Sequence, residues 1–489
     1  MPILAIFIWP PIATIFFAQM TFARALVVST LVGYLLLPEQ FSIDLPGLPA
    51  VDKKFTLTAG MVLSLMLFSS SRKQTQITLE NKGVWLGRLI KFALVVVMIA
   101  PVLTFLDNRS PVFAGPTVLQ ALRPWDLLSI TLETLYYAVP FLLARRYLAT
   151  PDMHRMVLKL LVTAGLLYSI FIMIEIRFSP QLNFWVYGYY QSSFVQHIRD
   201  GGFRPMVFLK HGLWVGFFLF TLVIAALALY RSSTTGERTR YLLAGLWLFG
   251  VLLVSKNVGA LGIAFLMAAA LFLPRVWQMR AILAVVIPFL FYPVVRQAGL
   301  VPTEQIMSVA NSISEGRAQS FQYRLDNEDE LLARALKKPA FGWGGWGRGL
   351  IYNEKGEKIS TSDGTWIIVL GTFGWVGYLS FFTLLTLPLL ALWHAKRRKD
   401  IPIETMAIAL ITTGNIIYLI PNSAISPIGW LMAGALAGFV QFDRVAQDSP
   451  EVQPASRKSR TPRYTRFALP KEDQGVRPRS PHRRSTSNP

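Results

Sequence analysis

Arginines and one aspartate stand out in the longest polar stretch between apolar runs, residues 297–364. Arg317 and Arg324 precede a glycine-rich run, Arg348 lies within that run, and Asp363 comes just before the next apolar run. A guanidinium group binds phosphate oxygens through paired hydrogen bonds and stays charged at any working pH. A carboxylate beside such groups can accept a proton, or it can cap the helix that follows. The stretch therefore predicts an anion-binding site, a composition that would also suit an anion transporter.

A shorter polar stretch, residues 178–205, adds further basic groups. Arg199 and Arg204 lie near its end, and Lys210 and His211 follow inside the next apolar run, 206–230. Ionisable residues within a membrane span are costly and are therefore candidates for function. Lys210 could instead extend its ammonium group to the nearby interface. His211, His197 and Asp363 are the alternatives for a group that accepts a proton.

Aromatic residues are interleaved with these charged residues. The ones we single out are Trp185 and Tyr189 in the shorter stretch and Trp343 and Trp346 in the longer one. Amphipathic rings concentrate at membrane interfaces, so an aromatic belt explains them without any ligand. The alternative is a surface on which sugar rings stack.

Several kinds of chemistry are not expected. The chain has no cysteine and five scattered histidines, which exclude thiol chemistry and give no metal-ligand spacing. The glycine run lacks the Lys-Ser/Thr ending of a phosphate-binding loop, so nucleotide binding is not predicted. We therefore expect neither a metal nor a cofactor.

The elements that would position these residues are membrane spans. Charged residues make up only 15% of the 489 residues, and apolar residues fall in long runs. The sequence predicts an all-α polytopic membrane protein with about 12–14 transmembrane helices. The expected spans are 3–19, 24–37, 56–70, 88–106, 127–143, 157–177, 206–230, 240–254, 258–273, 280–296, 365–393, 403–420 and 427–442.

The chain divides into a transmembrane domain, 1–442, which contains the large loop 297–364, and a basic tail, 443–489. Residues 318–337 of the loop are expected to form an amphipathic helix that Pro339 ends. The tail is rich in Pro, Ser and basic residues, so it is expected to be disordered. The net charge of +21 favours contact with the bilayer surface over nucleic acid, because the chain is a membrane protein.

The basic residues also predict the orientation. Short loops on one side hold most of them, among them Arg72, Lys73, Arg145, Arg146 and the run 396–399. By the positive-inside rule this side faces the cytoplasm, which places the C-terminus inside and both large loops outside.

Three stretches together resemble the O-antigen ligase and O-antigen polymerase superfamily of bacterial membrane glycosyltransferases. One is RLDNEDELLARALKKPAFGWGGWGR, Arg324 to Arg348, which is similar to the family's arginine, short helix and P-x-x-G-x-G. Another is SDGTWIIVLGTFGWVGY, Ser362 to Tyr378. The third is GGFRPM, Gly201 to Met206, similar to the arginine-bearing stretch before a span.

The resemblance implies a GT-C-like fold in the bacterial inner membrane, with its active site facing the periplasm. Such enzymes transfer a glycan from undecaprenyl pyrophosphate to an acceptor hydroxyl without a metal, by an inverting mechanism, in exopolysaccharide or surface polysaccharide biosynthesis. Arg204 and Arg324 would then bind the pyrophosphate, with Arg317 and Arg348 as further candidates. Asp363 stands where the family commonly has histidine, which favours a polymerase or a ligase-like protein. Other polysaccharide assembly proteins would be possible partners.

The alternative is a transporter or flippase of lipid-linked glycans. Such proteins often contain internal repeats and discontinuous helices. The sequence shows no repeat between its halves, and no broken helix pair is predicted. A receptor or scaffold that uses the basic tail would leave the loop residues unexplained.

Overall fold

The computed structural model describes residues 1–44, 50–68, 79–199, 201–313, 315–395, 400–423 and 425–444. The predicted tail therefore lies outside the described residues apart from its first two, and so do Arg72, Lys73 and the run 396–399. Within the described part the chain is overwhelmingly helical, and its strands are two or three residues long. The all-α class is confirmed at this level.

The helices and strands are numbered in chain order. The helices are α1 (Pro2–Gln19), α2 (Phe22–Leu36), α3 (Lys53–Phe68), α4 (Val84–Asp107), α5 (Pro124–Tyr147), α6 (Pro151–Phe178), α7 (Leu182–Tyr187), α8 (Gly212–Ser232), α9 (Thr235–Val254), α10 (Val258–Phe272), α11 (Arg275–Leu290), α12 (Tyr292–Gln297), α13 (Thr303–Ile313), α14 (Glu315–Ala335), α15 (Thr365–Ala395), α16 (Ile403–Leu419) and α17 (Pro427–Gln441), with one 3₁₀ turn, Phe194–His197. The strands are β1 (Ser42–Ile43), β2 (Val51–Asp52), β3 (Leu79–Asn81), β4 (Val112–Ala114), β5 (Thr117–Leu119), β6 (Ile198–Arg199), β7 (Gly202–Phe203) and β8 (Phe442–Arg444).

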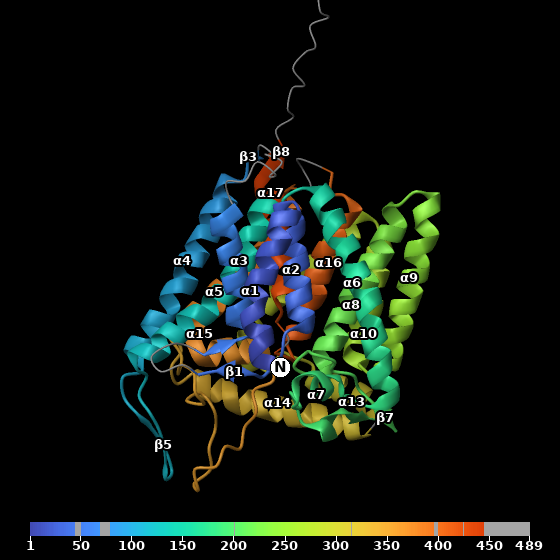
Figure 1. Ribbon diagram of the computed structural model, residues 1–489. Helices are drawn as coiled ribbons and strands as arrows, with labels where there is room; N and C mark the ends of the chain where they lie inside the picture. The colour runs from blue at the N-terminus through green and yellow to red at the C-terminus, as the bar shows by residue number, and fades with distance from the viewer. Residues whose placement is uncertain are drawn as a thin grey trace, which may run out of the picture. The chain divides into compact units, whose positions relative to one another are not determined.

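Most of the predicted apolar runs fall on one helix each of a side-by-side bundle, whereas the run 280–296 is divided between α11 and α12 (Figure 1). Within the described residues, six helices are long and apolar enough to cross a membrane: α1, α4, α5, α6, α8 and α15. Four more, α2, α10, α16 and α17, are apolar but shorter. Together they form an all-α bundle of the kind found in multi-pass membrane proteins, although the total number of crossings stays a prediction.

The bundle is arranged around three nearly fully buried helices, α8, α16 and α17. Helix α17 packs along α5, α8 along α9, and α4 along α15. Small residues permit the closest approaches. A Cβ at Gly434 or Gly438 of α17 would overlap backbone carbonyls of α5. Packing through small residues is typical of helices that associate in a bilayer.

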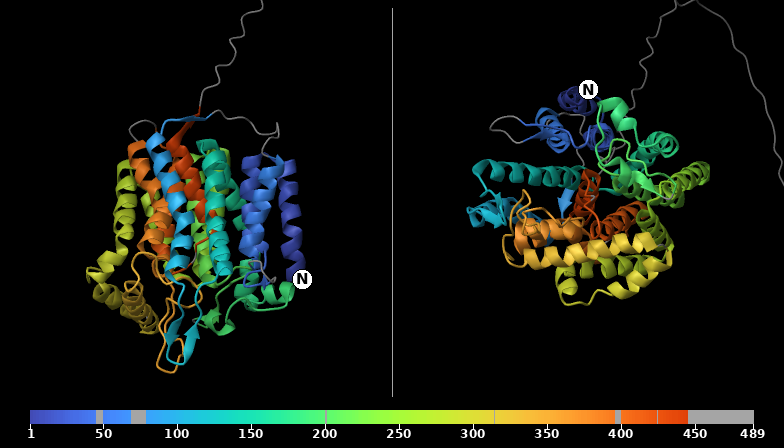
Figure 2. Two further views of the ribbon diagram at one scale, coloured as in Figure 1. Left: turned by 90° about the vertical axis from the view of Figure 1, so that its left-hand side faces the viewer. Right: turned by 90° about the horizontal axis from the view of Figure 1, so that it is seen from below.

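The connections separate onto two ends of the bundle. Helices α7, α13 and α14 and the hairpins β1–β2, β4–β5 and β6–β7 lie at one end, together with the N-terminus, while β3 pairs with β8 at the other (Figures 1 and 2). Both loops that carry the candidate residues are therefore on the same side. We call this the loop side; that it faces the periplasm stays a prediction.

Helix α14 crosses the loop side of the bundle, as the view from below shows (Figure 2). Its observed bounds, Glu315–Ala335, agree with the amphipathic helix expected at 318–337. Its own residues Leu325, Leu331 and Leu332 are buried, and the helix packs against α15. This helix carries Arg324 towards the start of α15.

Helix α15 is broken, which the sequence analysis did not foresee. Gly374 has φ 61° and ψ −162°, a conformation essentially restricted to glycine. The carbonyls of Gly371 and Thr372, left without partners by the break, accept hydrogen bonds from the amides of Trp343 and Gly344 (2.8 and 3.0 Å). The amides of Trp375 and Val376 donate to the carbonyls of Pro339 and Ala340 (2.7 and 3.3 Å).

The first part of the glycine-rich run thus fills the break in α15. Unpaired backbone groups are costly away from water, so a broken helix needs such partners. The glycines serve close approach: a Cβ at Gly342 would overlap the backbone of α15 around Thr372. No broken helix pair was predicted, and the structure shows one broken helix, α15, which makes the case against a transporter weaker.

We expect Gly374→Ala to destabilise the protein by about 3 kcal/mol or more. The added methyl group would adopt a forbidden backbone conformation and overlap the carbonyl of Ala340. Thermal unfolding of the protein in detergent measures the effect. Gly371→Ala is the matched control, because a Cβ there meets nothing within 4 Å. Equal melting temperatures for the two variants would contradict this account of the break.

Candidate functional site

Two of the predicted charged residues form an ion pair at the loop side. Arg324 Nε lies 3.3 Å from an Asp363 carboxylate oxygen, and both side chains are about one-third exposed. Arg324 also donates to the carbonyl of Pro421 (3.3 Å). Asn422, next in the chain, accepts from the amide and hydroxyl groups of Thr365 through its carbonyl. The pair therefore lies where α14, the start of α15 and the end of α16 meet.

Arg204 approaches the same region from the shorter loop. The hydroxyl group of Tyr418 donates a hydrogen bond to the carbonyl of Leu213 (2.8 Å), the residue after Gly212, which the side chain of Arg204 contacts. Arg324 donates to the carbonyl of Pro421 in the segment that follows Tyr418. Arg204 donates to the carbonyl of Lys256 (3.3 Å), and its side chain lies against Gly212, where a Cβ would overlap it. The two arginines from separate loops thus converge, and we call Arg204, Arg324 and Asp363 the arginine cluster.

A buried carboxylate holds the loop that carries Arg204. Glu175, near the end of α6, accepts hydrogen bonds from the amides of Leu182, Met206 and Val207 at 3.0, 2.7 and 2.7 Å. Val207 has a positive φ of 54°, so residues 206–209 do not form a helix. Lys210 and His211, which were expected inside the apolar run 206–230, therefore precede the helix, since α8 begins only at Gly212.

The two candidate histidines are adjacent but differ in availability. Their ring centroids are 4.3 Å apart. His197 is fully buried, with Nδ1 2.9 Å from the carbonyl of Ser193 and Nε2 accepting from the amide of Gly212 (3.3 Å). His211 caps α8, and its Nδ1 accepts from the amide of Leu213 (3.2 Å). In both rings the nitrogen that can accept a hydrogen bond is used by a backbone amide, so Asp363 is the better candidate for the proton acceptor.

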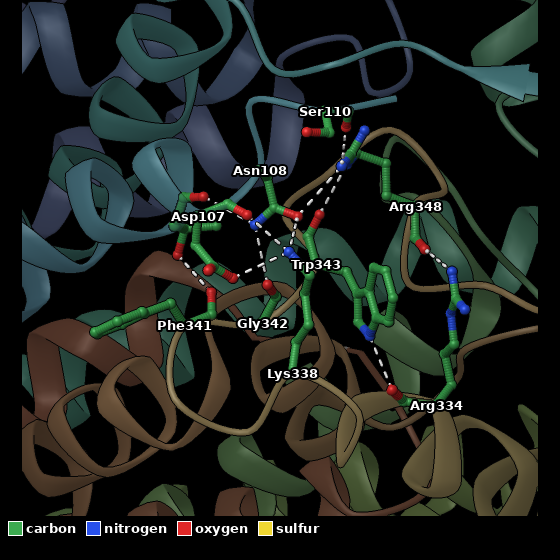
Figure 3. Close-up of polar contacts among 10 residues, drawn as sticks. Asp107, Asn108, Ser110, Arg334, Lys338, Phe341, Gly342, Trp343 and Arg348 are labelled. Carbon is green, nitrogen blue, oxygen red and sulfur yellow. Dashed lines mark hydrogen bonds and ion pairs between the residues drawn. The ribbon is translucent and has the colours of Figure 1, made fainter. Parts of the chain in front are cut away.

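Arg348 lies apart from the arginine cluster and is 2% exposed (Figure 3). It donates to the carbonyls of Trp343, Gln120 and Ser110 at 3.0, 2.6 and 3.0 Å, and to the side chain of Asn108 at 3.2 Å. All three guanidinium nitrogens are thus used within the protein. This arrangement gives Arg348 a structural role in place of the predicted phosphate contact.

Trp343 is also engaged within the protein (Figure 3). The guanidinium group of Arg334 lies 3.6 Å from its ring centroid, and its indole nitrogen donates to the carbonyl of Arg334 (2.8 Å). Lys338 joins the same assembly through Asp107 and Asn108, at 3.0 and 3.1 Å. Trp343 therefore holds the loop in place, and Arg334 covers one of the ring faces on which a sugar could stack.

Trp346 has a different environment. It is 55% exposed, has a positive φ of 55°, and lines a cavity of about 540 Å³. It also lines a second cavity of about 290 Å³. Of the tryptophans in the longer loop, Trp346 is the one that faces open space.

The remaining candidates are divided between exposed and structural positions. Trp185 is 57% exposed on α7, and the hydroxyl group of Tyr189 donates to the carbonyl of Glu39 (2.6 Å). The side chains of Arg199 and Arg317 lie outside the described part of the chain, although their backbones belong to β6 and α14. Lys210 lines the 540 Å³ cavity.

Two charged residues of that cavity were missed. Lys54 at the start of α3 and Glu133 within α5 form an ion pair of 2.6 Å. The signal was present, because Glu133 lies inside the expected span 127–143, where a carboxylate is costly and so a candidate for function. None of the candidate residues predicted from the sequence lies in that span.

Glu328 on α14 is a buried carboxyl group, 6% exposed, that accepts a hydrogen bond from the indole nitrogen of Trp366 (3.3 Å). Burial raises the pKa of Glu328 to about 7. The hydrogen bond from Trp366 and the positive charge of Arg296 lower the pKa, but by less than burial raises it. Between the ordinary value of 4.5 and this value, the folded protein binds more protons than the unfolded chain. Stability is therefore fully present below about pH 4.5 and is lost as the pH rises through about 7.

We expect Glu328→Gln to remove this pH dependence and to stabilise the protein at pH 8, by on the order of 2 kcal/mol. Glutamine keeps the acceptor for Trp366 and loses the charge. Melting temperatures between pH 5 and pH 8 measure the effect. The control is Glu330→Gln, because Glu330 is exposed on the same helix. An unchanged pH profile in Glu328→Gln would refute the assignment.

The fold and site define a multi-pass α-helical membrane protein with a basic cluster at one end of its bundle. No family model matches the chain, and no curated protein matches it either.

Proposed function

We propose that the protein is a metal-independent membrane glycosyltransferase that takes a glycan from undecaprenyl pyrophosphate and joins it to an acceptor hydroxyl. In this proposal it is a polysaccharide polymerase or O-antigen-ligase-like enzyme with a GT-C-like fold, in the bacterial inner membrane. It would act on the periplasmic side in exopolysaccharide or surface polysaccharide biosynthesis, with a cytoplasmic C-terminus. The observation that supports the proposal is that Arg204, at Gly212, and Arg324, at Pro421, both lie near Tyr418, with Asp363 3.3 Å from Arg324.

The chemistry needs stabilisation of a leaving group. As the acceptor oxygen attacks the anomeric carbon, the bond between that carbon and the pyrophosphate oxygen breaks, and negative charge grows on the pyrophosphate. Fixed guanidinium groups aimed at that charge lower the barrier. The proton of the acceptor hydroxyl passes to the carboxylate of Asp363, and attack from the opposite face inverts the configuration.

The partly exposed ion pair is compatible with this role. Arg324 and Asp363 retain about one-third of their side-chain surface, so a ligand can reach both. Arg324 can bind a phosphate oxygen through a free part of its guanidinium fork while Nε stays beside Asp363. Thr365, close to Asp363 in the chain, lines the 540 Å³ cavity. The arginine cluster therefore lies beside an open space.

A transporter of lipid-linked glycans is the second candidate, and the break in α15 favours it. Discontinuous helices in transporters commonly leave their ends free for a substrate or an ion. Here the carbonyls of Gly371 and Thr372 and the amides of Trp375 and Val376 already have backbone partners. The break is satisfied from within, which makes the enzyme the better proposal.

The test uses the full-length protein in lipid vesicles that contain an undecaprenyl-pyrophosphate-linked repeat unit. The proposed enzyme lengthens or transfers the glycan and releases undecaprenyl pyrophosphate, which chromatography of the lipid extract detects. Movement of the intact lipid-linked glycan between leaflets, without release of undecaprenyl pyrophosphate, would establish the transporter instead.

A further inference from the structure

Helix α14 holds the segment 361–366, which leads into α15, through two contacts inside the protein. The side-chain oxygen of Asn327 accepts a hydrogen bond from the amide of Thr361 (2.8 Å), and Glu328 accepts one from the indole nitrogen of Trp366 (3.3 Å). The side chains of Asn327, Glu328 and Trp366 are all buried. The segment that carries the carboxylate of the arginine cluster is therefore fixed against α14.

Glu328 also lies one helical turn after Arg324. Residues four apart are neighbours on the surface of a helix, and Arg324 acts electrostatically on Glu328. Arg324 is partly exposed and pairs with Asp363 at 3.3 Å. One guanidinium group thus lies between an exposed carboxylate and a buried carboxyl group. A charge on Glu328 therefore acts at the place where a ligand of the arginine cluster would bind.

The other charged or titratable groups around Glu328 come from three helices. Arg296 of α12 acts on Glu328 but is already paired with Asp329 of α14 at 2.9 Å. Tyr292 of α12 contributes a neutral phenol, and the titratable side chain of α13, Glu304, is exposed. Because burial outweighs the nearby cations, the pKa of Glu328 is about 7. Its charge therefore changes near neutral pH.

We propose that anion binding at the arginine cluster is coupled to a proton on Glu328, so that the cluster binds its anion more tightly when Glu328 is neutral. The inference rests on the proposed function, in which this anion is the pyrophosphate of the donor. It adds a regulation by pH on the loop side. Because the coupling is reciprocal, a bound anion also favours the protonated form of Glu328.

The physical cause is competition for Arg324. An ionised Glu328 attracts the guanidinium group and repels an incoming anion, and a buried charge is weakly screened. Protonation removes the charge but leaves an oxygen that still accepts the hydrogen bond from Trp366, so the anchor of α15 persists. Affinity for the anion therefore rises as the pH falls from 8 to 6, and binding near pH 7.5 takes up protons.

The experiment measures binding of methanedisulfonate to the full-length protein in phosphatidylcholine nanodiscs by titration calorimetry. This probe has two sulfonates joined by one carbon, as a pyrophosphate has two phosphates joined by one oxygen, and it stays fully ionised between pH 6 and pH 8. We expect the wild type to bind it at least about fivefold more tightly at pH 6 than at pH 8. Titrations at pH 7.5 in two buffers of different ionisation enthalpy should show proton uptake, a measurement that needs no variant.

Glu328→Gln should bind the probe at both pH values with the affinity of the wild type at pH 6, and without proton uptake. Glu330→Gln is the matched control, because Glu330 is an exposed carboxylate on the same helix, and it should keep the pH dependence of the wild type. Arg324→Ala should lose binding at both pH values, which shows that the probe occupies the arginine cluster.

Two results would overturn the coupling and leave the arginine cluster as an anion site. One is equal affinity at pH 6 and pH 8 in the wild type. The other is a pH dependence that persists in Glu328→Gln, which would assign it to another group such as His211. Absence of binding at either pH would instead refute the arginine cluster as an anion site, and with it both the coupling and the proposed function.

Discussion

Arg324→Ala is expected to reduce glycan transfer by at least about 100-fold while the protein still folds and inserts. The substitution removes a guanidinium group that pairs with Asp363 and lies near Tyr418, and it leaves behind a site that is one-third exposed. Water can solvate Asp363 there, so the cost to stability is small. Arg324→Lys keeps the charge but loses the planar fork, and we expect it to recover only part of the activity.

The measurement is the pool of undecaprenyl-linked saccharide in cells that carry the variant, extracted and separated beside wild type. Complete repeat units that accumulate and are accessible from the periplasmic side would have been made and flipped but not transferred. Accumulation on the cytoplasmic side would instead identify a flippase. An unchanged pool would exclude lipid-linked glycans as the substrate.

Two comparison variants make the result specific. Arg204→Ala should give the same accumulation, because Arg204 approaches Tyr418 from the other loop. Arg109→Ala should leave the pool at the wild-type level, since Arg109 is exposed between α4 and β4, and its contact is with the ring of Phe105. A normal pool in both Arg204→Ala and Arg324→Ala would refute the roles assigned to these residues.

The helices were predictable because their signal is local. Each apolar run is a property of consecutive residues, and lipid leaves the backbone few options besides a helix. The same holds for α14. The spacing of Leu325 and Leu332, which predicts a helix, and Pro339, which ends it, lie within one short segment of the sequence. The number of crossings stays a prediction, because several helices are shorter than a bilayer span requires.

The break in α15 was not predictable in the same way. Gly374 belongs to an apolar run that contains two other glycines, Gly371 and Gly377, and nothing local distinguishes it. Its conformation depends on Pro339 and Ala340, more than thirty residues earlier, which accept the hydrogen bonds of the second half-helix. The only local sequence feature of such long-range backbone pairing is a glycine, which by itself does not predict a break.

Residue type alone also did not distinguish the exposed arginines of the longer loop from the buried one. Arg324 and Arg348 looked equivalent as phosphate binders, yet one is one-third exposed and the other is 2% exposed. Their difference comes from residues 108–120, which close over Arg348 with carbonyl groups. The sequence contained no sign that this distant hairpin would cover it.

Arg348→Ala is expected to destabilise the protein by about 3–5 kcal/mol, because it leaves several buried acceptors without a donor and opens a space in a buried region. The side chain donates to carbonyls from both the hairpin region and the glycine-rich run, so its loss leaves several buried acceptors unpaired. Because that run also fills the break in α15, the disturbance reaches the bundle itself. Arg348→Lys should rescue little, since a single ammonium group cannot reach acceptors on both sides.

Thermal unfolding in detergent and the yield of folded protein separate this role from ligand binding. Arg348→Ala should lower both, whereas Arg324→Ala should lower neither and should lose activity alone. Full stability in Arg348→Ala, together with accumulation of lipid-linked saccharide, would return Arg348 to the group of substrate-binding residues. The opposite behaviour of two arginines in one loop would show that exposure, rather than residue type, decides which of them can meet a pyrophosphate.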